Sequence, residues 1–186
     1  RRRHLGQTQT TGRRARRLRI TDTTGALSHE RARCVSATAF RTLPRVPPVP
    51  LRCAVLGAGR IGRIHATNLA GAVAGARLVA LADPQPDPLT RLASELGVSR
   101  AVADYRELLT APDIDAVVVC TPTSTHYQVL LDVDASGKQI FAEKPIDLDL
   151  ARIDAVNGAV SRRGLNMMVG LQRRYDPDFR RVRDLV

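Results

Sequence analysis

The sequence is poor in aromatic residues, cysteine and lysine. Its 186 residues include no tryptophan, and only 3% are aromatic, so aliphatic side chains must fill the core. Three scattered cysteines exclude a disulfide framework and a cysteine metal site, and they favour a reducing compartment such as the cytoplasm. No apolar run approaches the ~20 residues of a membrane span. These absences predict a cytoplasmic globular protein without a metal site or a membrane partner.

The formal net charge of +11 lies almost entirely in residues 1–50. They contain twelve arginines against two acidic residues, whereas residues 51–186 contain seventeen basic and sixteen acidic residues. The segment shows no sustained periodicity and ends in a proline-rich run, so we expect a disordered leader. A translation start placed upstream of the true one is the favoured origin, with a transit peptide or a nucleic-acid tail as alternatives. Because the leader lacks interleaved aromatic residues, nucleic acid is not the expected partner.

A glycine motif follows a short apolar run in residues 51–69, LRCAVLGAGRIGRIHATNL. Residues 53–56 are typical of a buried parallel strand, and an amphipathic helix is expected next, with an apolar face of Ile61, Ile64 and Leu69. The glycines permit a tight turn and a close approach to a pyrophosphate, which the helix N-terminus attracts. An ordinary strand-to-helix turn is the alternative. The order of elements favours a dinucleotide site, whose residues are Gly57, Gly59, Arg60, Ile61 and Gly62.

An aspartate ends the second apolar run, residues 77–82. Asp83 lies 21 residues beyond Gly62, which matches the spacing of the acid that binds the adenosine ribose hydroxyls. Its carboxylate would repel a 2′-phosphate, and proline, not arginine, follows it. The sequence therefore predicts NAD as the cofactor, with NADP less favoured. The alternative is an aspartate that caps the next turn.

The valine-rich run at residues 115–120 is the clearest strand of the sequence. It leads into Thr121 and Pro122, which we expect beside the nicotinamide because ligands bind at the carboxyl ends of parallel strands. Thr123 or Ser124 is expected to cap the following helix. His126 is included among the cofactor-site residues, although a capping or packing role in the first turn is favoured over catalysis. The helix carries an apolar face that also includes Asp134, a conflict that the sequence does not explain.

The fifth apolar run, residues 138–142, is followed at its carboxyl end by Lys144. Lys138 and Lys144 are the only lysines among the 29 basic residues of the chain. An ammonium group at that edge of the sheet can bind a substrate hydroxyl and stabilise a developing alkoxide. A solvated loop lysine is the alternative.

Five segments together resemble the Gfo/Idh/MocA oxidoreductases. They are GAGRIGRIHATNL, LAD, DAVVVCTPTSTH, GKQIFAEKP and GLQRRYDPDF, in the family's order and within residues 51–186. The last segment looks most like that of inositol 2-dehydrogenases and related polyol dehydrogenases, although Gln172 departs from the asparagine or methionine typical of it. The resemblance implies a Rossmann domain followed by an α+β substrate domain.

The resemblance also implies residue roles. It makes Lys144 the substrate-binding and catalytic lysine, Arg173 a substrate contact and Glu143 a cofactor-site residue. The family takes an aspartate and a proton-accepting histidine from its second domain, whose first helix we expect after Asp176. The chain as given is therefore expected to bind NAD but to turn over little substrate.

These observations together predict an α/β fold with a doubly wound, six-stranded parallel sheet of the Rossmann type. We expect a leader (1–50), a NAD-binding domain (51–170) and the start of a truncated substrate domain (171–186). The expected function is NAD-dependent oxidation of a CH–OH group in a polyol or sugar, by a full-length protein that forms homo-oligomers. A non-catalytic dinucleotide-binding module or sensor is the alternative.

Overall fold

A six-stranded parallel sheet organises the computed structural model, which describes residues 49–186. The predicted disordered leader comprises residues 1–50, of which 1–48 lie outside the described residues. The strand order is β3-β2-β1-β4-β5-β6, and each neighbouring pair is parallel. This order confirms the predicted Rossmann-type sheet. The strands are β1 (Leu51–Leu56), β2 (Ala76–Ala82), β3 (Ala101–Val102), β4 (Ala116–Val119), β5 (Gln139–Ala142) and β6 (Met167–Val169).

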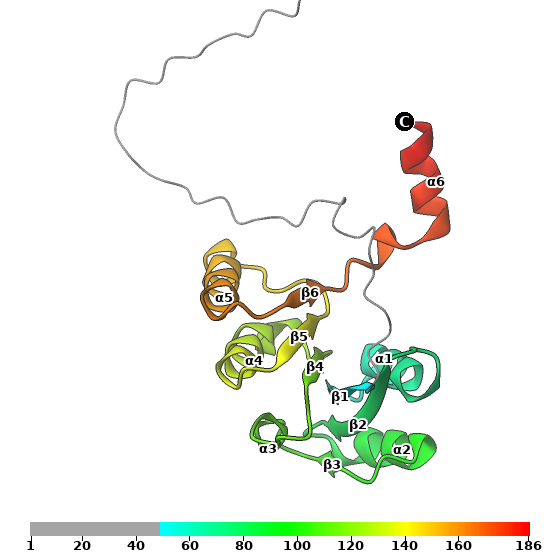
Figure 1. Ribbon diagram of the computed structural model, residues 1–186, viewed down its shortest axis with the longest axis vertical. Coiled ribbons are helices and arrows are strands. Elements are labelled where there is room, and N and C mark those ends of the chain that lie inside the picture. The colour runs from blue at the N-terminus through cyan, green and yellow to red at the C-terminus, as the bar shows by residue number, and fades with distance from the viewer. Residues whose placement is uncertain (1–48) are drawn as a thin grey trace, which may run out of the picture. The chain divides into compact units, whose positions relative to one another are not determined.

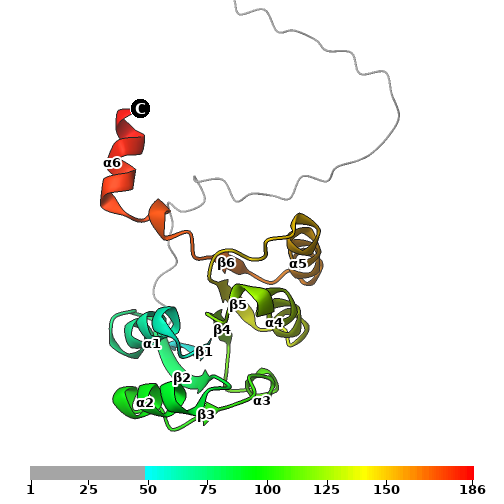
Figure 2. The ribbon, with the colours of Figure 1, turned by 180° about the vertical axis from the view of Figure 1, so that it is seen from behind.

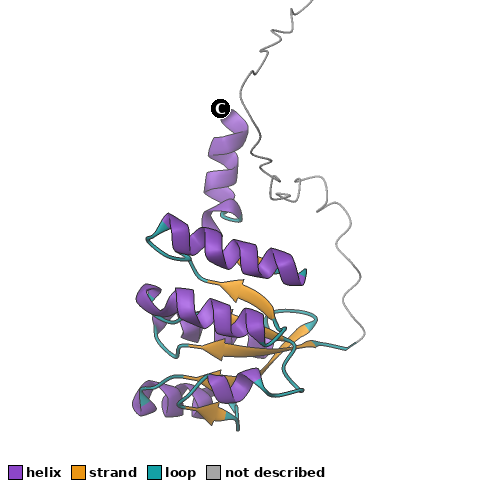
Figure 3. Ribbon diagram, turned by 90° about the vertical axis from the view of Figure 1, so that its left-hand side faces the viewer, coloured by secondary structure: helices purple, strands orange, loops and turns teal. Residues whose placement is uncertain are grey.

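Helices cover both faces of this sheet. Figure 1 and Figure 2 show α1 and α2 on one face and α3, α4 and α5 on the other. Figure 3 shows the strand arrows pointing the same way, so the carboxyl ends of all strands share one edge. The helices are α1 (Arg60–Gly71), α2 (Pro86–Leu96), α3 (Arg106–Leu109), α4 (Thr123–Ala135), α5 (Leu150–Arg163), the 3-10 helix η2 (Gln172–Arg174) and α6 (Pro177–Leu185).

The core consists of two aliphatic clusters, one on each face of the sheet. Val55 and Leu56 are neighbours in β1, yet they belong to different clusters because successive side chains of a strand point to opposite faces. Both are fully buried, as expected for a central strand covered by helices on both sides. Leu, Val, Ile and Ala fill nearly all of the core positions, in agreement with the scarcity of aromatic residues.

Small residues form the buried face of α1. Gly62 and Ala66 are buried, whereas Ile64 is 50% exposed. The expected apolar face of Ile61, Ile64 and Leu69 is therefore wrong at Ile64, whereas Ile61 and Leu69 are half-buried. The cause is close packing: a Cβ atom at position 62 would lie 1.7 Å from the carbonyl oxygen of Gly57. A helix this close to the strand has room only for small side chains on its inner face.

An ion pair between α4 and α5 resolves the conflict at Asp134. The Asp134 carboxylate is buried, and its Oδ2 accepts a hydrogen bond of 2.9 Å from Nε of Arg163. The buried face of α4 also carries Val129, Leu130 and Val133. Asp134 therefore lies on that face because a cation from the neighbouring helix compensates its charge.

Charged residues at the amino edge of the sheet bind partners within the protein. Arg52 and Asp115 form a bidentate pair, with Nε–Oδ2 and Nη2–Oδ1 distances of 2.9 and 2.7 Å. These bonds, together with one from the Arg52 backbone N–H, lower the pKa of Asp115 to about 2. Lys138 is buried just before β5, and its Nζ donates to the carbonyl oxygens of Ala111 and Ile114 at 2.7 and 2.9 Å. Burial lowers the pKa of Lys138.

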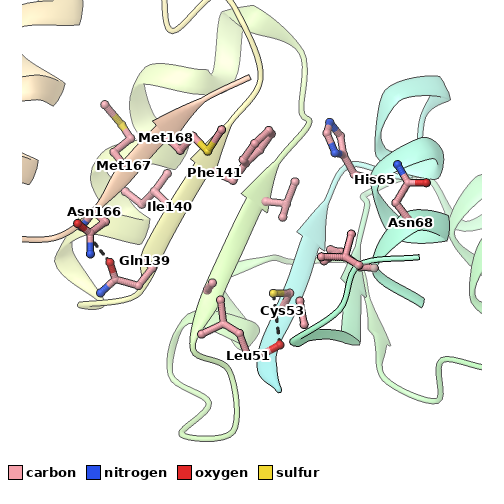
Figure 4. Close-up of a pocket in the computed structure, with 15 residues that line it drawn as sticks. Leu51, Cys53, His65, Asn68, Gln139, Ile140, Phe141, Asn166, Met167 and Met168 are labelled. Carbon is pink, nitrogen blue, oxygen red and sulfur yellow. Dashed lines mark hydrogen bonds between the residues drawn. The ribbon is translucent and has the colours of Figure 1, made fainter. Parts of the chain in front are cut away.

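The α1 face of the sheet has an apolar hollow of about 540 Å³. Figure 4 shows it between α1 and β6, with Phe141, Met167 and Met168 on one side and Leu51 and Cys53 on the floor. Beyond β6, α6 has no buried residue and projects away from the sheet in Figure 1. Within residues 49–186, no helix is long and apolar enough to span a membrane.

Candidate functional site

The glycine loop, residues 57–62, joins β1 to α1 at the carboxyl edge of the sheet. Gly57 has φ +99°, which disfavours any L side chain, and a Cβ atom there would lie 2.6 Å from the Cys120 carbonyl oxygen. Its N–H donates to the carbonyl of Ala82 at 2.7 Å. The loop therefore touches the ends of both β2 and β4, on either side of the point where the strand order reverses.

The N-terminus of α1 is open to solvent at Gly59. Gly59 is the N-cap residue, and a Cβ atom there would have no heavy atom within 4 Å. Arg60 is exposed and Ile61 is half-buried in the first turn. Because the first N–H groups of a helix have no partner within it, this turn offers donors and a partial positive charge to an anion. A diphosphate group can approach the backbone here.

Asp83 lies against the glycine loop. Its Oδ2 accepts a hydrogen bond from the N–H of Ala58 at 2.7 Å, and its Oδ1 accepts one from Gln85 at 2.8 Å. The carboxylate is half-buried at the end of β2 and retains lone pairs for further donors. Its position next to the phosphate-binding turn is the one that a ribose-binding acid requires.

The segment after β4 forms the next part of this edge. Thr121 has a buried Oγ1 without a hydrogen-bond partner among the described residues, which is rare for a buried hydroxyl. The exposed Pro122 occupies the N-cap position of α4. The expected capping by Thr123 or Ser124 is therefore wrong: no side chain caps this helix, and the Thr125 hydroxyl donates to the Pro122 carbonyl at 2.8 Å.

The His126 side chain is buried inside the first turn of α4, with 1% of it exposed. Its Nδ1 lies 2.7 Å from the carbonyl oxygen of Pro145, and its Nε2 lies 2.8 Å from that of Thr121. Carbonyl oxygens only accept hydrogen bonds and a neutral imidazole carries a single N–H, so either tautomer donates to one of the two carbonyls and contacts the other. The ring therefore links the segments that follow β4 and β5.

Glu143 directly follows β5 and binds a residue that the sequence analysis did not single out. Its Oε1 lies 2.8 Å from Nε2 of His65 in α1, and its Oε2 accepts a bond of 3.2 Å from the N–H of Lys144. The His65 ring also packs against Phe141, with centroids 5.1 Å apart. Figure 4 shows His65 projecting from α1 toward β5. His65 lies three residues after Gly62 and therefore on the same, sheet-facing side of the helix. This spacing is the feature of the sequence from which His65 could have been predicted as a site residue.

Lys144 is exposed at this edge, and its Nζ has no partner among residues 49–186. It differs in this from Lys138, whose Nζ is fully engaged at the other end of β5. The strand order reverses between β1 and β4, and β5 is the next strand. An exposed ammonium group at the carboxyl end of β5 can donate up to three hydrogen bonds to a ligand.

Arg173 lies away from these residues, in η2. Its guanidinium is stacked 4.4 Å from the centroid of the Phe179 ring. No contact among the described residues joins it to the glycine loop or to Lys144. Those residues also include no cluster of three His, Cys, Asp or Glu side chains that could hold a metal ion.

Fold and site together define a dinucleotide-binding domain of the Rossmann class: a 3-2-1-4-5-6 parallel sheet with a glycine loop and an acid at the end of β2. Residues 51–171 match the family model described as "Oxidoreductase family, NAD-binding Rossmann fold". The chain therefore belongs to the Gfo/Idh/MocA oxidoreductase family, and NAD is the cofactor of its Rossmann domain.

Several curated relatives are named inositol dehydrogenases. The chain is 44% identical over 129 residues to scyllo-inositol 2-dehydrogenase (NAD(+)) of Bacillus subtilis, covering 69% of this chain and 38% of that protein. It is 46% identical over 136 residues to inositol 2-dehydrogenase of Rhizobium meliloti, covering 73% and 40%. The chain thus spans about two-fifths of the length of these relatives.

A solved structure agrees with the sequence relatives. It is scyllo-inositol dehydrogenase from Lactobacillus casei with bound NAD(H) and scyllo-inositol. The TM-score is 0.69 at 33% identity, and the match covers 73% of this chain and 40% of that one. The predicted family and fold class are confirmed.

Proposed function

We propose that this chain is the cofactor-binding part of an NAD-dependent dehydrogenase that oxidises a CH–OH group of an inositol-type polyol. The observation that carries the proposal is the exposed Lys144 ammonium at the carboxyl edge of the sheet, the edge that also carries the glycine loop and Asp83. The names of the relatives at 44% and 46% identity supply the substrate class. We also propose a cytoplasmic, homo-oligomeric full-length protein, a NAD-binding domain at residues 51–170 and a substrate domain that begins at residue 171.

The residues present fit NAD. The open space at Gly59 and the free N–H groups of Arg60 and Ile61 would receive the diphosphate. Asp83 would accept hydrogen bonds from both adenosine ribose hydroxyls and would repel a 2′-phosphate, so NAD is preferred over NADP. The unpartnered hydroxyl of Thr121, with Pro122 and Glu143, would border the nicotinamide. The nicotinamide, when bound, accepts the hydride.

Lys144 and Arg173 would act on the substrate. The ammonium group would donate a hydrogen bond to the reacting hydroxyl and stabilise the negative charge that develops on its oxygen. Removal of the hydroxyl proton requires a general base with a pKa near the working pH, which the family resemblance places in the second domain. Arg173, on η2, would contact the polyol once that domain orders the segment around it.

Cofactor titration tests the first half of the proposal. NADH and NADPH are titrated into the chain by calorimetry, together with Asp83→Ala. We expect the chain to bind NADH more tightly than NADPH, and Asp83→Ala to lose roughly tenfold to a hundredfold in NADH affinity, because each hydrogen bond to a charged group contributes about 1.5–3 kcal/mol. Equal affinity for the two dinucleotides, or an unchanged preference in Asp83→Ala, would refute the ribose assignment.

An activity assay tests the second half. The chain is assayed for NAD reduction with myo-inositol, scyllo-inositol and a panel of sugars, both alone and fused to the remaining part of the Rhizobium meliloti relative. We expect turnover only in the fusion, because the substrate needs a second wall to position it. A fusion that binds NADH but oxidises none of these compounds would favour the alternative, a dinucleotide-binding sensor.

A further inference from the structure

Two histidines contact the lysine loop, residues 143–145, from opposite faces of the sheet. His65 belongs to α1 and reaches the Glu143 side chain, at 2.8 Å. His126 belongs to α4 and reaches the Pro145 carbonyl oxygen, at 2.7 Å. Lys144 lies between the two contacted residues. The loop is therefore held on each side of its lysine by an imidazole from a different helix.

The contact from His65 continues to the backbone of the lysine. One carboxylate oxygen of Glu143 contacts Nε2 of His65, and the other accepts a hydrogen bond from the Lys144 backbone N–H. Gly170, just after β6, leaves the room for this carboxylate, because a Cβ atom there would lie 3.1 Å from Glu143 Oε1. The histidine, the carboxylate and the Lys144 amide thus form one hydrogen-bonded row.

The contact from His126 ties the other end of the loop to β4. The same ring reaches the carbonyl of Thr121 at 2.8 Å, and that residue lies two positions after the end of the central strand β4. The ring is buried, so water does not compete for its two partners.

We propose that His65 and His126 are positioning residues that fix the backbone of Lys144 relative to the glycine loop. The inference rests on the proposed role of Lys144 and adds two residues to it. The Lys144 side chain is a flexible four-carbon chain, and its Nζ has no partner among residues 49–186, so only its backbone can be fixed in advance. His65 belongs to the helix that begins at the glycine loop, so the same rigid element sets the positions of the cofactor and of the lysine. Small errors in such placement are costly in rate.

The scarcity of lysine provides a direct probe. The 186-residue chain labelled with ¹⁵N-lysine has only two lysine backbone amides, those of Lys138 and Lys144. Lys144→Arg assigns the two NMR signals. The Lys138 amide, at the other end of β5, is an internal reference for the integrity of the fold.

Five variants are compared with the parent chain. His65→Ala and His126→Ala remove the contacts, and His65→Gln keeps an N–H donor within reach of Glu143. Thr67→Ala and Gln128→Ala are matched controls on the exposed sides of α1 and α4. In His65→Ala we expect the Lys144 amide signal to move and its exchange with water to rise roughly fivefold to tenfold, because the acceptor at Glu143 is released. His126→Ala should move the same signal, His65→Gln should restore the parent exchange rate, and the controls should change neither.

An unmoved Lys144 signal with unchanged exchange in both folded alanine variants would overturn the inference. Should His126→Ala fail to fold, His126→Phe is measured in its place: it keeps a ring in the buried site but has no donor for the Pro145 carbonyl, so it must also move the Lys144 signal. NADH titration of the same samples separates this inference from the proposed function. A parent chain that binds no NADH would refute the function, whereas the amide signals would still decide whether the histidines hold the loop.

Discussion

The two lysines of this chain stand at opposite ends of one strand and have opposite environments. Lys138 precedes β5, is buried, and gives its ammonium protons to the carbonyls of Ala111 and Ile114. Lys144 follows β5, is exposed, and has no partner for its Nζ among the described residues. The same contrast holds for the two edges of the sheet. Charges at the amino edge are paired within the protein, whereas those at the carboxyl edge have capacity left for a ligand.

This difference between the two edges indicates that the amino edge contributes to the stability of the fold and the carboxyl edge to ligand binding. At the amino edge, removal of a charge leaves a buried partner without its bond, so the fold is weakened. At the carboxyl edge, removal of a charge costs the fold little and costs the ligand much. Substitutions at the two edges should therefore change different measured quantities.

The largest effect is expected for Lys144→Met in the fusion with the second domain of the Rhizobium meliloti relative. Turnover should fall roughly 10²–10³-fold, because one donor to the developing oxyanion is lost. The free energy of unfolding should stay within about 0.5 kcal/mol of the parent value, since the side chain is exposed. Steady-state kinetics and urea unfolding measure the two quantities. Comparable turnover in parent and variant would contradict the catalytic role.

Lys138→Met is the counterpart at the amino edge. Two carbonyl oxygens lose their donor, so unfolding should become easier by about 2–3 kcal/mol, while NADH affinity should remain that of the parent. Urea unfolding and NADH titration on the 186-residue chain decide this. A variant as stable as the parent would show that the buried ammonium contributes nothing to the fold.

Gly59→Ala tests whether the open space at the glycine loop serves the cofactor. A Cβ atom at position 59 meets nothing within 4 Å in the protein, so the fold should be retained. The methyl group would occupy the approach of the diphosphate, and NADH affinity should fall by about tenfold or 1.4 kcal/mol. Gly71→Ala, at the other end of α1 and equally free of contacts, is the control and should bind NADH as the parent does. Unchanged affinity in Gly59→Ala would place the diphosphate elsewhere.

The smallest effect is expected for the Arg52–Asp115 pair and depends on pH. Hydrogen bonds from Arg52 lower the pKa of Asp115 to about 2 in the folded protein, below the ordinary value of an aspartate. The pair therefore stabilises the fold above about pH 4, and this contribution disappears as the pH falls toward 2. Because both side chains are about one-third exposed, the effect should be only a few degrees in melting temperature. Melting curves at pH 6 and at pH 2–4 should show that Asp115→Asn removes this part of the pH dependence.

Residues close in sequence made much of the fold predictable. The glycine spacing, the distance from Gly62 to Asp83 and the valine run of β4 each depend on neighbours within one βαβ unit, and each led to the observed element. The NAD-binding Rossmann domain and its family were predictable for that reason.

What the sequence did not reveal depends on contacts between distant segments. Asp134 lies on a buried face because of Arg163 in the next helix, and no local pattern indicates that pair. The inner face of α1 was misassigned because the helix packs closely on the strand where Gly62 contacts Gly57. The spacing of hydrophobic residues carries no information about this close contact. His65 was missed because its partner Glu143 lies two strands away in the sheet.

The central position of β1 in the sheet has a consequence for the folding of the chain during its synthesis on the ribosome. β1 pairs with β2, which follows shortly in the chain, and with β4, which is made much later. Because synthesis proceeds from the N-terminus, β1, the glycine loop and β2 are made before β4, and one edge of β1 then lacks its neighbouring strand. The open edge of a largely apolar strand is a template for pairing with other chains. The strand order that creates the cofactor site thus also sets the stage of translation at which aggregation is most probable, the interval before β4 emerges.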